Sequence, residues 1–423
     1  MDSAASYGFH TSEAPAVNTR TTRIALATAL VLGIAGATVA PASAGARVPA
    51  GAHPAAGPAA RPSSGPSTTQ APDAEALRAA ISGLPADDAT AALVRVSGTD
   101  GAWRGSSGVH DLASGRPADP DGRFRVGSVT KVFTAAVVLQ LAGEGKLGLD
   151  RSARHYLPDL IPAAYGQVTV RQLLNHTSGI PSPDPGNGDT LEDWYAHRFD
   201  VQDPAATVRD ATALEPDFAP GTQQHYDNIG YTVAGLLIER VTGDTYASQV
   251  SRRVLKPLRL ADTYFPGTDP AVRGPHNHGY QVFGTSGELR DVTVWGATDA
   301  WAAGDLISTT ADLERFTRAL FGGRVVRGPL LREMFTLPDA SVREYGTGRP
   351  AAYSAGLSVI RLGGREVWGK TGGRWGYNTA IAATPGLSRT LVYSVNATDA
   401  KGADMNATAM NIMVAAFGAP DPE

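Results

Sequence analysis

A serine and a lysine three residues apart stand at the start of a long apolar stretch. Ser128 and Lys131 follow Gly127, and most residues from 132 to 141 are apolar. Positions i and i+3 share one face of a helix, so the hydroxyl and the amine can meet where a buried helix begins. The helix N-terminus favours a developing anion, and burial favours a neutral lysine that can take the proton of a serine. The spacing therefore predicts a nucleophilic serine activated by a lysine.

The scarcity of lysine supports this interpretation. The chain has 37 basic residues but only five lysines, at positions 131, 146, 256, 370 and 401. Arginine stays protonated, whereas a buried lysine can lose its proton. A lysine inside an apolar helix is therefore better explained by chemistry than by solubility. The alternative is a chance Ser-x-x-Lys, which is a weak motif by itself.

A second polar segment precedes another predicted apolar helix. Tyr226 can present its phenol to Ser128 as a base or a proton relay, which requires a phenol pKa well below ~10. We expect Lys131 and Lys370 to lower that pKa. Asn228 offers an amide that can hold a substrate amide by both of its ends. The alternative is a capped helix start with a packed tyrosine.

A third segment, Lys370-Thr371-Gly372, stands at the end of a predicted strand and is followed by Gly373. The two glycines let a substrate backbone lie against the strand edge. The Gly373 N–H can then join the Ser128 N–H as an oxyanion hole, with Lys370 and Thr371 holding a substrate carboxylate. The alternative is a strand-end turn with a solvated lysine.

In this order and combination, the three segments resemble the motifs of penicillin-recognising serine enzymes. The most similar branch is that of class C β-lactamases and Streptomyces-type D-alanyl-D-alanine carboxypeptidases. Segments 168–179 and 303–309 also match, and the resemblance covers roughly residues 73 to 417. It implies a β-lactamase/transpeptidase-like α+β fold, with an antiparallel sheet flanked by helices, a helical subdomain, and the site between them.

The resemblance also implies a role for each matching residue. Ser128 is the nucleophile that forms an acyl-enzyme, and Lys131 and Tyr226 share the role of general base. Asn228 contacts the acyl-side amide of the substrate. The substrate carboxylate is bound by the third motif, that is by Lys370 and Thr371.

Two positions depart from the branch. Asp227 stands where serine is usual, and a carboxylate pointing inward would raise the pKa of Tyr226. Lys370 stands where the Streptomyces-type carboxypeptidases often have histidine. Lysine is usual among class C lactamases but is also found in penicillin-binding proteins, so this lysine does not distinguish the two groups.

The function we expect is that of an exported monomeric serine hydrolase without a cofactor, acting on a D-alanyl peptide as a D-alanyl-D-alanine carboxypeptidase. Alternatives within the fold are a class C-like β-lactamase, an esterase and a D-amino-acid peptidase, with a β-lactam or an ester as the substrate. An alternative outside enzymology is a non-catalytic penicillin-binding-like sensor or cell-wall binding module, which Asp227 keeps open.

Other function classes find little support. The net charge of −4 gives no indication of nucleic-acid binding. The absence of cysteine excludes disulfides, thiolate zinc sites and a cysteine nucleophile. No Gly-x-Ser-x-Gly elbow is present, and His276 and His278 lack a His-Glu-x-x-His companion, so neither an α/β-hydrolase nor a metal site is expected. His176 is interpreted as a residue that structures its loop.

The N-terminus reads as an export signal. Arg20 and Arg23 precede an apolar run from Ile24 to Val39, and Ala42-Ser43-Ala44 fits the small-residue cleavage rule. The run is shorter than the ~20 residues that span a bilayer, although an uncleaved anchor is the alternative. We therefore expect a signal peptide at 1–44, a disordered Ala/Pro/Gly-rich linker at 45–72 and a catalytic domain at 73–419, outside a bacterial cell.

Periodicity within this domain predicts strands at both ends and helices between them. Strands are expected at 91–96 and 103–109 and, in two hairpins, at 353–370 and 378–395. Helices are expected over 74–81, 129–143, 168–174, 231–241, 309–321 and 404–417. The two chain ends should therefore build one sheet.

Overall fold

The computed structural model describes residues 70–184, 186–188, 190–284, 287–402 and 404–422. The predicted signal peptide at 1–44 and the linker up to residue 69 lie outside these ranges. Within them, no helix combines the length and the apolar character needed to span a bilayer.

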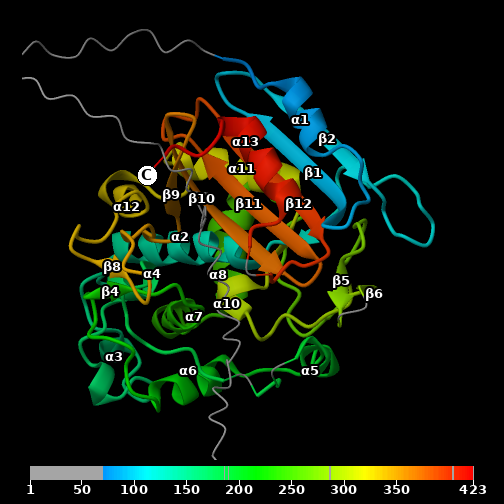
Figure 1. Cartoon of the computed structure of the whole chain (residues 1–423). Helices are drawn as coiled ribbons and strands as arrows, with labels where there is room; N and C mark the ends of the chain where they lie inside the picture. Colours follow the sequence, from blue (N-terminus) through cyan, green and yellow to red (C-terminus); the bar gives the residue numbers. More distant parts are fainter. Residues whose placement is uncertain (1–69, 185, 189, 285–286, 403, 423) are drawn as a thin grey trace, which may run out of the picture.

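The centre of the fold is a six-stranded antiparallel sheet with the strand order β2-β1-β12-β11-β10-β9 (Figure 1). Its strands are β1 (Ala89–Ser97), β2 (Trp103–Gly108), β9 (Ser358–Leu362), β10 (Arg365–Arg374), β11 (Tyr377–Ala383) and β12 (Thr390–Ala397). The two ends of the chain meet where β1 pairs with β12, with Leu93 opposite Ser394. The prediction of one sheet built from both ends, in an α+β fold, is confirmed.

Helices cover both faces of this sheet. α1 (Ala74–Ala80) and α13 (Ala407–Phe417) lie on one face, and α2 (Thr130–Gly143) and α11 (Thr310–Phe321) lie on the other (Figure 1). Successive residues of β1 point to opposite faces, so Leu93 belongs to the α2 side of the core and Val94 to the α13 side.

The middle of the chain forms a helical region beside the sheet, drawn mostly in green in Figure 1. Its helices are α3 (Ala153–Tyr156), α4 (Val170–Leu174), α5 (Leu191–Ala196), α6 (Pro204–Thr212), α7 (Ile229–Thr242), α8 (Tyr246–Val250), α9 (Lys256–Leu258) and α10 (Trp301–Gly304), with α12 (Gly328–Glu333) further along the chain. Two-residue strand pairs join β3 (Phe124–Arg125) to β7 (Ile307–Ser308) and β4 (Gln223–Gln224) to β8 (Arg343–Glu344), and β5 (Tyr280–Phe283) pairs with β6 (Glu288–Asp291).

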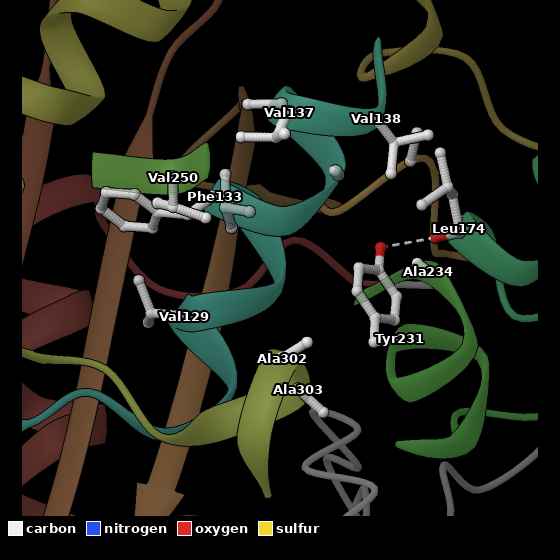
Figure 2. Close-up of a cluster of buried hydrophobic side chains, with 14 of the residues drawn as sticks. Val129, Phe133, Val137, Val138, Leu174, Tyr231, Ala234, Val250, Ala302 and Ala303 are labelled. Atoms are coloured by element: carbon white, nitrogen blue, oxygen red, sulfur yellow. Dashed lines mark hydrogen bonds between the residues drawn. The ribbon is translucent and has the colours of Figure 1, made fainter. Parts of the chain in front are cut away.

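Helix α2 lies between the sheet and this helical region, and it is buried along most of its length. Figure 2 shows its apolar side chains surrounded by residues of α7 and α10. Phe133 stacks on Phe316 of α11 with 3.7 Å between the ring centroids. Tyr231 of α7 donates a 2.7 Å hydrogen bond to the carbonyl of Leu174 (Figure 2). A helix that is apolar on all faces is stable only in such an enclosed position.

The structure corrects the predicted start of the strand before the first C-terminal hairpin. The strand was expected from Tyr353, but β9 begins at Ser358. Gly356 has φ 85°, and a Cβ at this position would lie 2.8 Å from the Cβ of Ala135. This glycine therefore lets the chain pack directly on α2, and the segment before it does not continue the ladder.

Candidate active site

Ser128 lies in a short 3-10 turn, η1 (Gly127–Val129), directly before α2. Gly127 has φ 53°, and a Cβ there would lie 2.7 Å from the backbone nitrogen of Gly373. A Cβ on Gly372 would lie 2.0 Å from the carbonyl oxygen of Val126. Only glycine at these positions lets strand β10 touch the turn that carries the serine.

Strand β10 presents its free edge at this place. Its pairing with β9 ends at Gly369, opposite Ser358, whereas its pairing with β11 continues to Arg374. The half of β10 from Lys370 onward therefore lies against η1. The predicted oxyanion hole requires the Ser128 and Gly373 N–H groups to be neighbours, and the close approach of the two backbones brings them together.

Lys131 is completely buried and makes three polar contacts. Its Nζ donates to Asn228 Oδ1 at 2.6 Å and to the carbonyl of Ala303 at 2.9 Å, and it lies 3.1 Å from Ser128 Oγ. The first two partners only accept hydrogen bonds, so they use two N–H bonds of the amine. The third position of a neutral amine is its lone pair, which then faces the serine hydroxyl. The geometry is that of a base aimed at its nucleophile.

The charge state of Lys131 agrees with that geometry. Burial, followed by the nearby Lys370, lowers the pKa of Lys131 well below its ordinary value, and only the carboxylate of Asp227 opposes this among the major influences. A buried ammonium is costly because it loses its hydration, so burial favours the neutral form of Lys131.

Lys370 and Tyr226 complete the centre. Lys370 is also buried, and burial lowers its pKa to about 7. Its Nζ donates to the carbonyl of Thr371 at 2.9 Å and lies 4.6 Å from the centroid of the Tyr226 ring. The Nζ of Lys131 lies 5.1 Å from the same ring. The groups at 128, 131, 226 and 370 therefore converge on one small volume, as the three motifs predicted.

The expected pKa of Tyr226 was wrong in direction. Burial raises the pKa of the phenol well above its ordinary value, and the Ser128 hydroxyl opposes this only in part. The two lysines do not offset burial, because their own burial disfavours their charged forms. The phenol oxygen makes no hydrogen bond of ordinary geometry within the described part of the chain. Tyr226 is thus a neutral phenol with a proton to give.

The hydrogen bonding of Asn228 also differs from what the sequence predicted. It is the N-cap residue of α7 and is exposed, but its carbonyl oxygen is occupied by Lys131. The amide therefore cannot hold a substrate by both ends while that bond is intact, and its NH₂ group remains for a substrate carbonyl. Thr371 is half-buried at the free edge of β10, where a substrate can reach it.

Sequence reasoning missed several partners in the site. The carbonyl of Ala303, at the end of α10, was not recognised as a partner of Lys131. Tyr353 lies near Lys370, with 5.9 Å between Nζ and the ring centroid. His176 and Asp227 lie together beneath Tyr226. The only indication in the sequence was that His176 and Asp227 stand in segments that match the family pattern. That match did not show that the two side chains would meet.

Comparison with known proteins is consistent with this geometry. A family model described as Beta-lactamase matches residues 77–414. A solved D-stereospecific amidohydrolase from Streptomyces sp. is similar with 34% sequence identity and a TM-score of 0.70, over 82% of this chain and 99% of that one. A D-amino acid amidase from Ochrobactrum anthropi SV3 is similar with 25% identity and a TM-score of 0.67, over 80% and 96% of the two chains.

Curated relatives match over less of their length. Penicillin-binding protein 4* of Bacillus subtilis (strain 168) is 26% identical over 316 residues, which are 72% of this chain and 67% of the relative. Protein flp of Staphylococcus aureus (strain COL) is 29% identical over 217 residues, 50% of this chain. The chain spans only 41% of the length of that protein.

Proposed function

Because the chain belongs to the Beta-lactamase family, and is thereby a serine hydrolase of the superfamily that includes penicillin-binding proteins, we propose that it hydrolyses amide bonds of D-aminoacyl compounds. The resemblance read from the three motifs is confirmed at the level of family and fold. The finer activity proposed is acyl transfer to Ser128 followed by hydrolysis of the acyl-enzyme.

The observation that carries the acyl-transfer part is the arrangement of partners around Lys131. With two N–H bonds committed to Asn228 and Ala303, the lone pair of the neutral amine accepts the proton of Ser128 as its oxygen attacks the substrate carbonyl. The negative charge that develops on the carbonyl oxygen falls between the N–H groups of Ser128 and Gly373.

Proton return to the leaving group is assigned to Tyr226. An amine leaves the tetrahedral intermediate only when its nitrogen gains a proton. The raised pKa of Tyr226 keeps its buried phenol protonated, so the phenol can donate this proton and does not act as a base. The proton on Lys131 can replace the one that Tyr226 gives. Water then attacks the acyl-enzyme, with Lys131 again taking the proton.

Support for D-aminoacyl substrates comes from similarity. The two solved structures described above are a D-stereospecific amidohydrolase and a D-amino acid amidase, and this chain covers almost all of each. A D-alanyl-D-alanine carboxypeptidase is the second candidate, as expected from the sequence. It is favoured by Lys370 and Thr371 at the free edge of β10, where a cationic amine and a hydroxyl can bind a terminal carboxylate.

The test measures turnover of four substrates by the purified chain: D-alaninamide, a D-Ala-D-Ala peptide, nitrocefin and a short-chain ester, with L-alaninamide as the stereochemical control. We expect the D-amide to exceed the L-amide by at least about 100-fold. A D-Ala-D-Ala rate above the D-amide rate would replace the first candidate by the second. Equal rates on the two enantiomers, or a nitrocefin rate that exceeds both the D-amide rate and the D-Ala-D-Ala rate, would reject both.

We also propose that the chain is exported and monomeric, from the signal-like segment at 1–44 and the expectations given above. N-terminal sequencing of the protein from a producing culture should find a start after Ala44. Size-exclusion chromatography with light scattering should give a single-chain mass, and a larger mass would contradict the monomer.

A further inference from the structure

A second acid–base pair lies buried beneath Tyr226. The Oδ2 of Asp227 is 3.5 Å from the Nδ1 of His176, and the backbone nitrogen of Asp227 lies 3.3 Å from the same ring nitrogen. Both residues are almost fully inaccessible to solvent, at 6% and 2% exposure. Placing a carboxylate and an imidazole in such an enclosure is costly unless they are paired, so their position next to the site requires an explanation.

The imidazole supports the aromatic ring of Tyr226. Its centroid is 4.6 Å from that of Tyr226, 5.2 Å from that of Tyr353 and 5.4 Å from that of Tyr231. The backbone of His176 has φ 62°, a left-handed conformation that few residues adopt. The Tyr226 ring therefore packs against His176 and Tyr353, and the amines of Lys131 and Lys370 lie 5.1 and 4.6 Å from its centroid. Any shift of the imidazole would move the phenol relative to Ser128.

The carboxylate of Asp227 acts on the charges of the same centre. It raises the pKa of Lys131, against burial and Lys370, and it raises the pKa of His176, against burial and the two lysines. The ionisable groups around the pair and Lys131 are Lys370 of β10, Lys401, Tyr226 just before α7, Tyr231 within α7, and Tyr353. Asp227 is the carboxylate in this set.

We propose that Asp227 and His176 form one positioning unit for this site. The imidazole holds the Tyr226 ring beside Ser128. The carboxylate supplies the negative charge that lets the buried centre, which contains two lysines, take up the proton of the serine. This inference rests on the proposed acyl-enzyme chemistry and assigns a use to the aspartate that replaces the usual serine. Neither residue touches the substrate, so both act through Tyr226 and Lys131.

A purely structural role for Asp227 predicts a different outcome. Its Oδ1 accepts a 2.6 Å hydrogen bond from the N–H of Gly230 and so caps the first turn of α7. Asparagine has the same shape and keeps this acceptor, but it carries no charge. Asp227→Asn therefore separates the cap from the counter-charge, and Asp227→Ser provides a second, smaller variant if the asparagine disturbs folding.

The experiment follows acylation of Ser128 by p-nitrophenyl acetate between pH 5 and 10, using the full chain and subtracting the rate of Ser128→Ala. In Asp227→Asn the acidic limb of the curve of acylation rate against pH should move to lower pH by about one unit, because Lys131 loses the carboxylate that favours its protonated form. The plateau rate should fall by about tenfold, because the base is weaker and the proton it accepts is less well compensated. A limb and plateau equal to those of the parent would overturn the inference and leave Asp227 as a helix cap.

The imidazole is tested with His176→Asn, since asparagine tolerates the left-handed backbone. The plateau rate of D-alaninamide turnover, which needs the proton of Tyr226, should fall by roughly 10- to 100-fold, with a smaller change in the acidic limb than in Asp227→Asn. If the two residues act as one unit, the double variant will lose much less than the product of the single losses. Losses that multiply would show two independent residues and would contradict the proposal.

The chain supplies a matched control in a similar but more exposed pair. Asp217 Oδ2 lies 3.4 Å from Nδ1 of His225, next to Tyr226 in the sequence, with side chains 27% and 35% exposed. Asp217→Asn should leave the limb and the plateau unchanged, because solvent screens this pair. If the parent chain itself shows no acylation at Ser128, the proposed function fails, which is a different result from an unchanged Asp227→Asn profile in an active parent.

Discussion

Two regions of this molecule gather ionisable side chains from distant segments, and they differ in what those side chains face. At the head of α2, Lys131 and Lys370 are almost fully buried around Ser128. On the surface near β6, His110, His276 and His278 cluster with 5.3 to 6.5 Å between ring centroids. Residue types alone would make both regions candidates for chemistry.

The difference lies in the use of the nitrogen atoms. His278 Nδ1 is bound to Asp291 at 2.6 Å, and His276 Nδ1 to the carbonyl of Gly274 at 2.7 Å. Across the described ranges, no three histidine, aspartate or glutamate side chains are arranged to hold a metal ion. The amine of Lys131 instead directs one position at a reactive hydroxyl. A cluster becomes a reactive centre when burial shifts its pKa values and its geometry leaves a lone pair free for a nucleophile.

The most direct way to break this comparison is to remove the nucleophile. Ser128→Ala should abolish covalent labelling by substrate and lower the turnover of the best substrate by about 10⁴-fold or more, because it removes the hydroxyl that lies against the Lys131 amine. Mass spectrometry of the quenched reaction measures the acyl adduct. An adduct that persists on another residue would move the site away from η1.

The lysine base is tested by exchanging it for arginine. Lys131→Arg should be as inactive as Lys131→Ala, with a loss of about 10³-fold in acylation rate, because arginine keeps its proton. Lys131→Met provides an apolar variant of similar length, with which to show by thermal unfolding that the fold persists. Appreciable activity in the arginine variant would contradict proton acceptance at this position.

The donor role of Tyr226 predicts a loss that depends on the leaving group. Tyr226→Phe should lower amide turnover by about 100-fold, because the leaving amine needs a proton. Acylation by p-nitrophenyl acetate should change by much less, since nitrophenolate leaves without one. Equal losses on both substrates would indicate that the hydroxyl acts on Ser128 as a base instead.

Lys370 connects the site to the pH dependence of stability. Its pKa is about 7 in the folded protein against 10.5 for the free group, so the unfolded chain binds the additional proton between these values. The free energy of unfolding therefore rises with pH across this window, and Lys370→Met should flatten that rise. The same variant should raise KM for a D-Ala-D-Ala peptide about tenfold near pH 6, where the amine is charged.

The matched control for this measurement is Lys146→Met. Lys146 is exposed and pairs with Glu144 at 3.0 Å, so it should change neither the pH slope of stability nor KM. A pH slope that is the same in Lys370→Met and in the parent would show that Lys370 titrates near its ordinary value.

The smallest effect is expected in the histidine cluster. Replacing His110, His276 and His278 together by glutamine should change turnover by less than about twofold, because the Nδ1 atoms of His276 and His278 are already bound to Gly274 and Asp291. Addition of Zn²⁺ or of a chelator should also leave activity unchanged. A metal-dependent rate that disappears in the triple variant would make the second region functional and remove the contrast.

Much of this site could be predicted from local sequence. The Ser128–Lys131 spacing, the apolar run after it and the turns of the two C-terminal hairpins each depend on residues a few positions apart, so they can be recognised without knowledge of any tertiary contact. The order of the three motifs was sufficient to predict the family, the fold and the convergence of the serine, the lysines and the tyrosine.

Only the tertiary structure decided how those groups are tuned. The Nζ of Lys131 meets a carbonyl 172 positions away and an amide 97 positions away, and no local pattern specifies either contact. Burial reversed the expected pKa shift of Tyr226, and Asp227 turned toward a histidine 51 positions earlier in the chain. Hydration and partner geometry depend on how distant segments pack, so sequence supplied the reactive groups while packing set their protonation and direction.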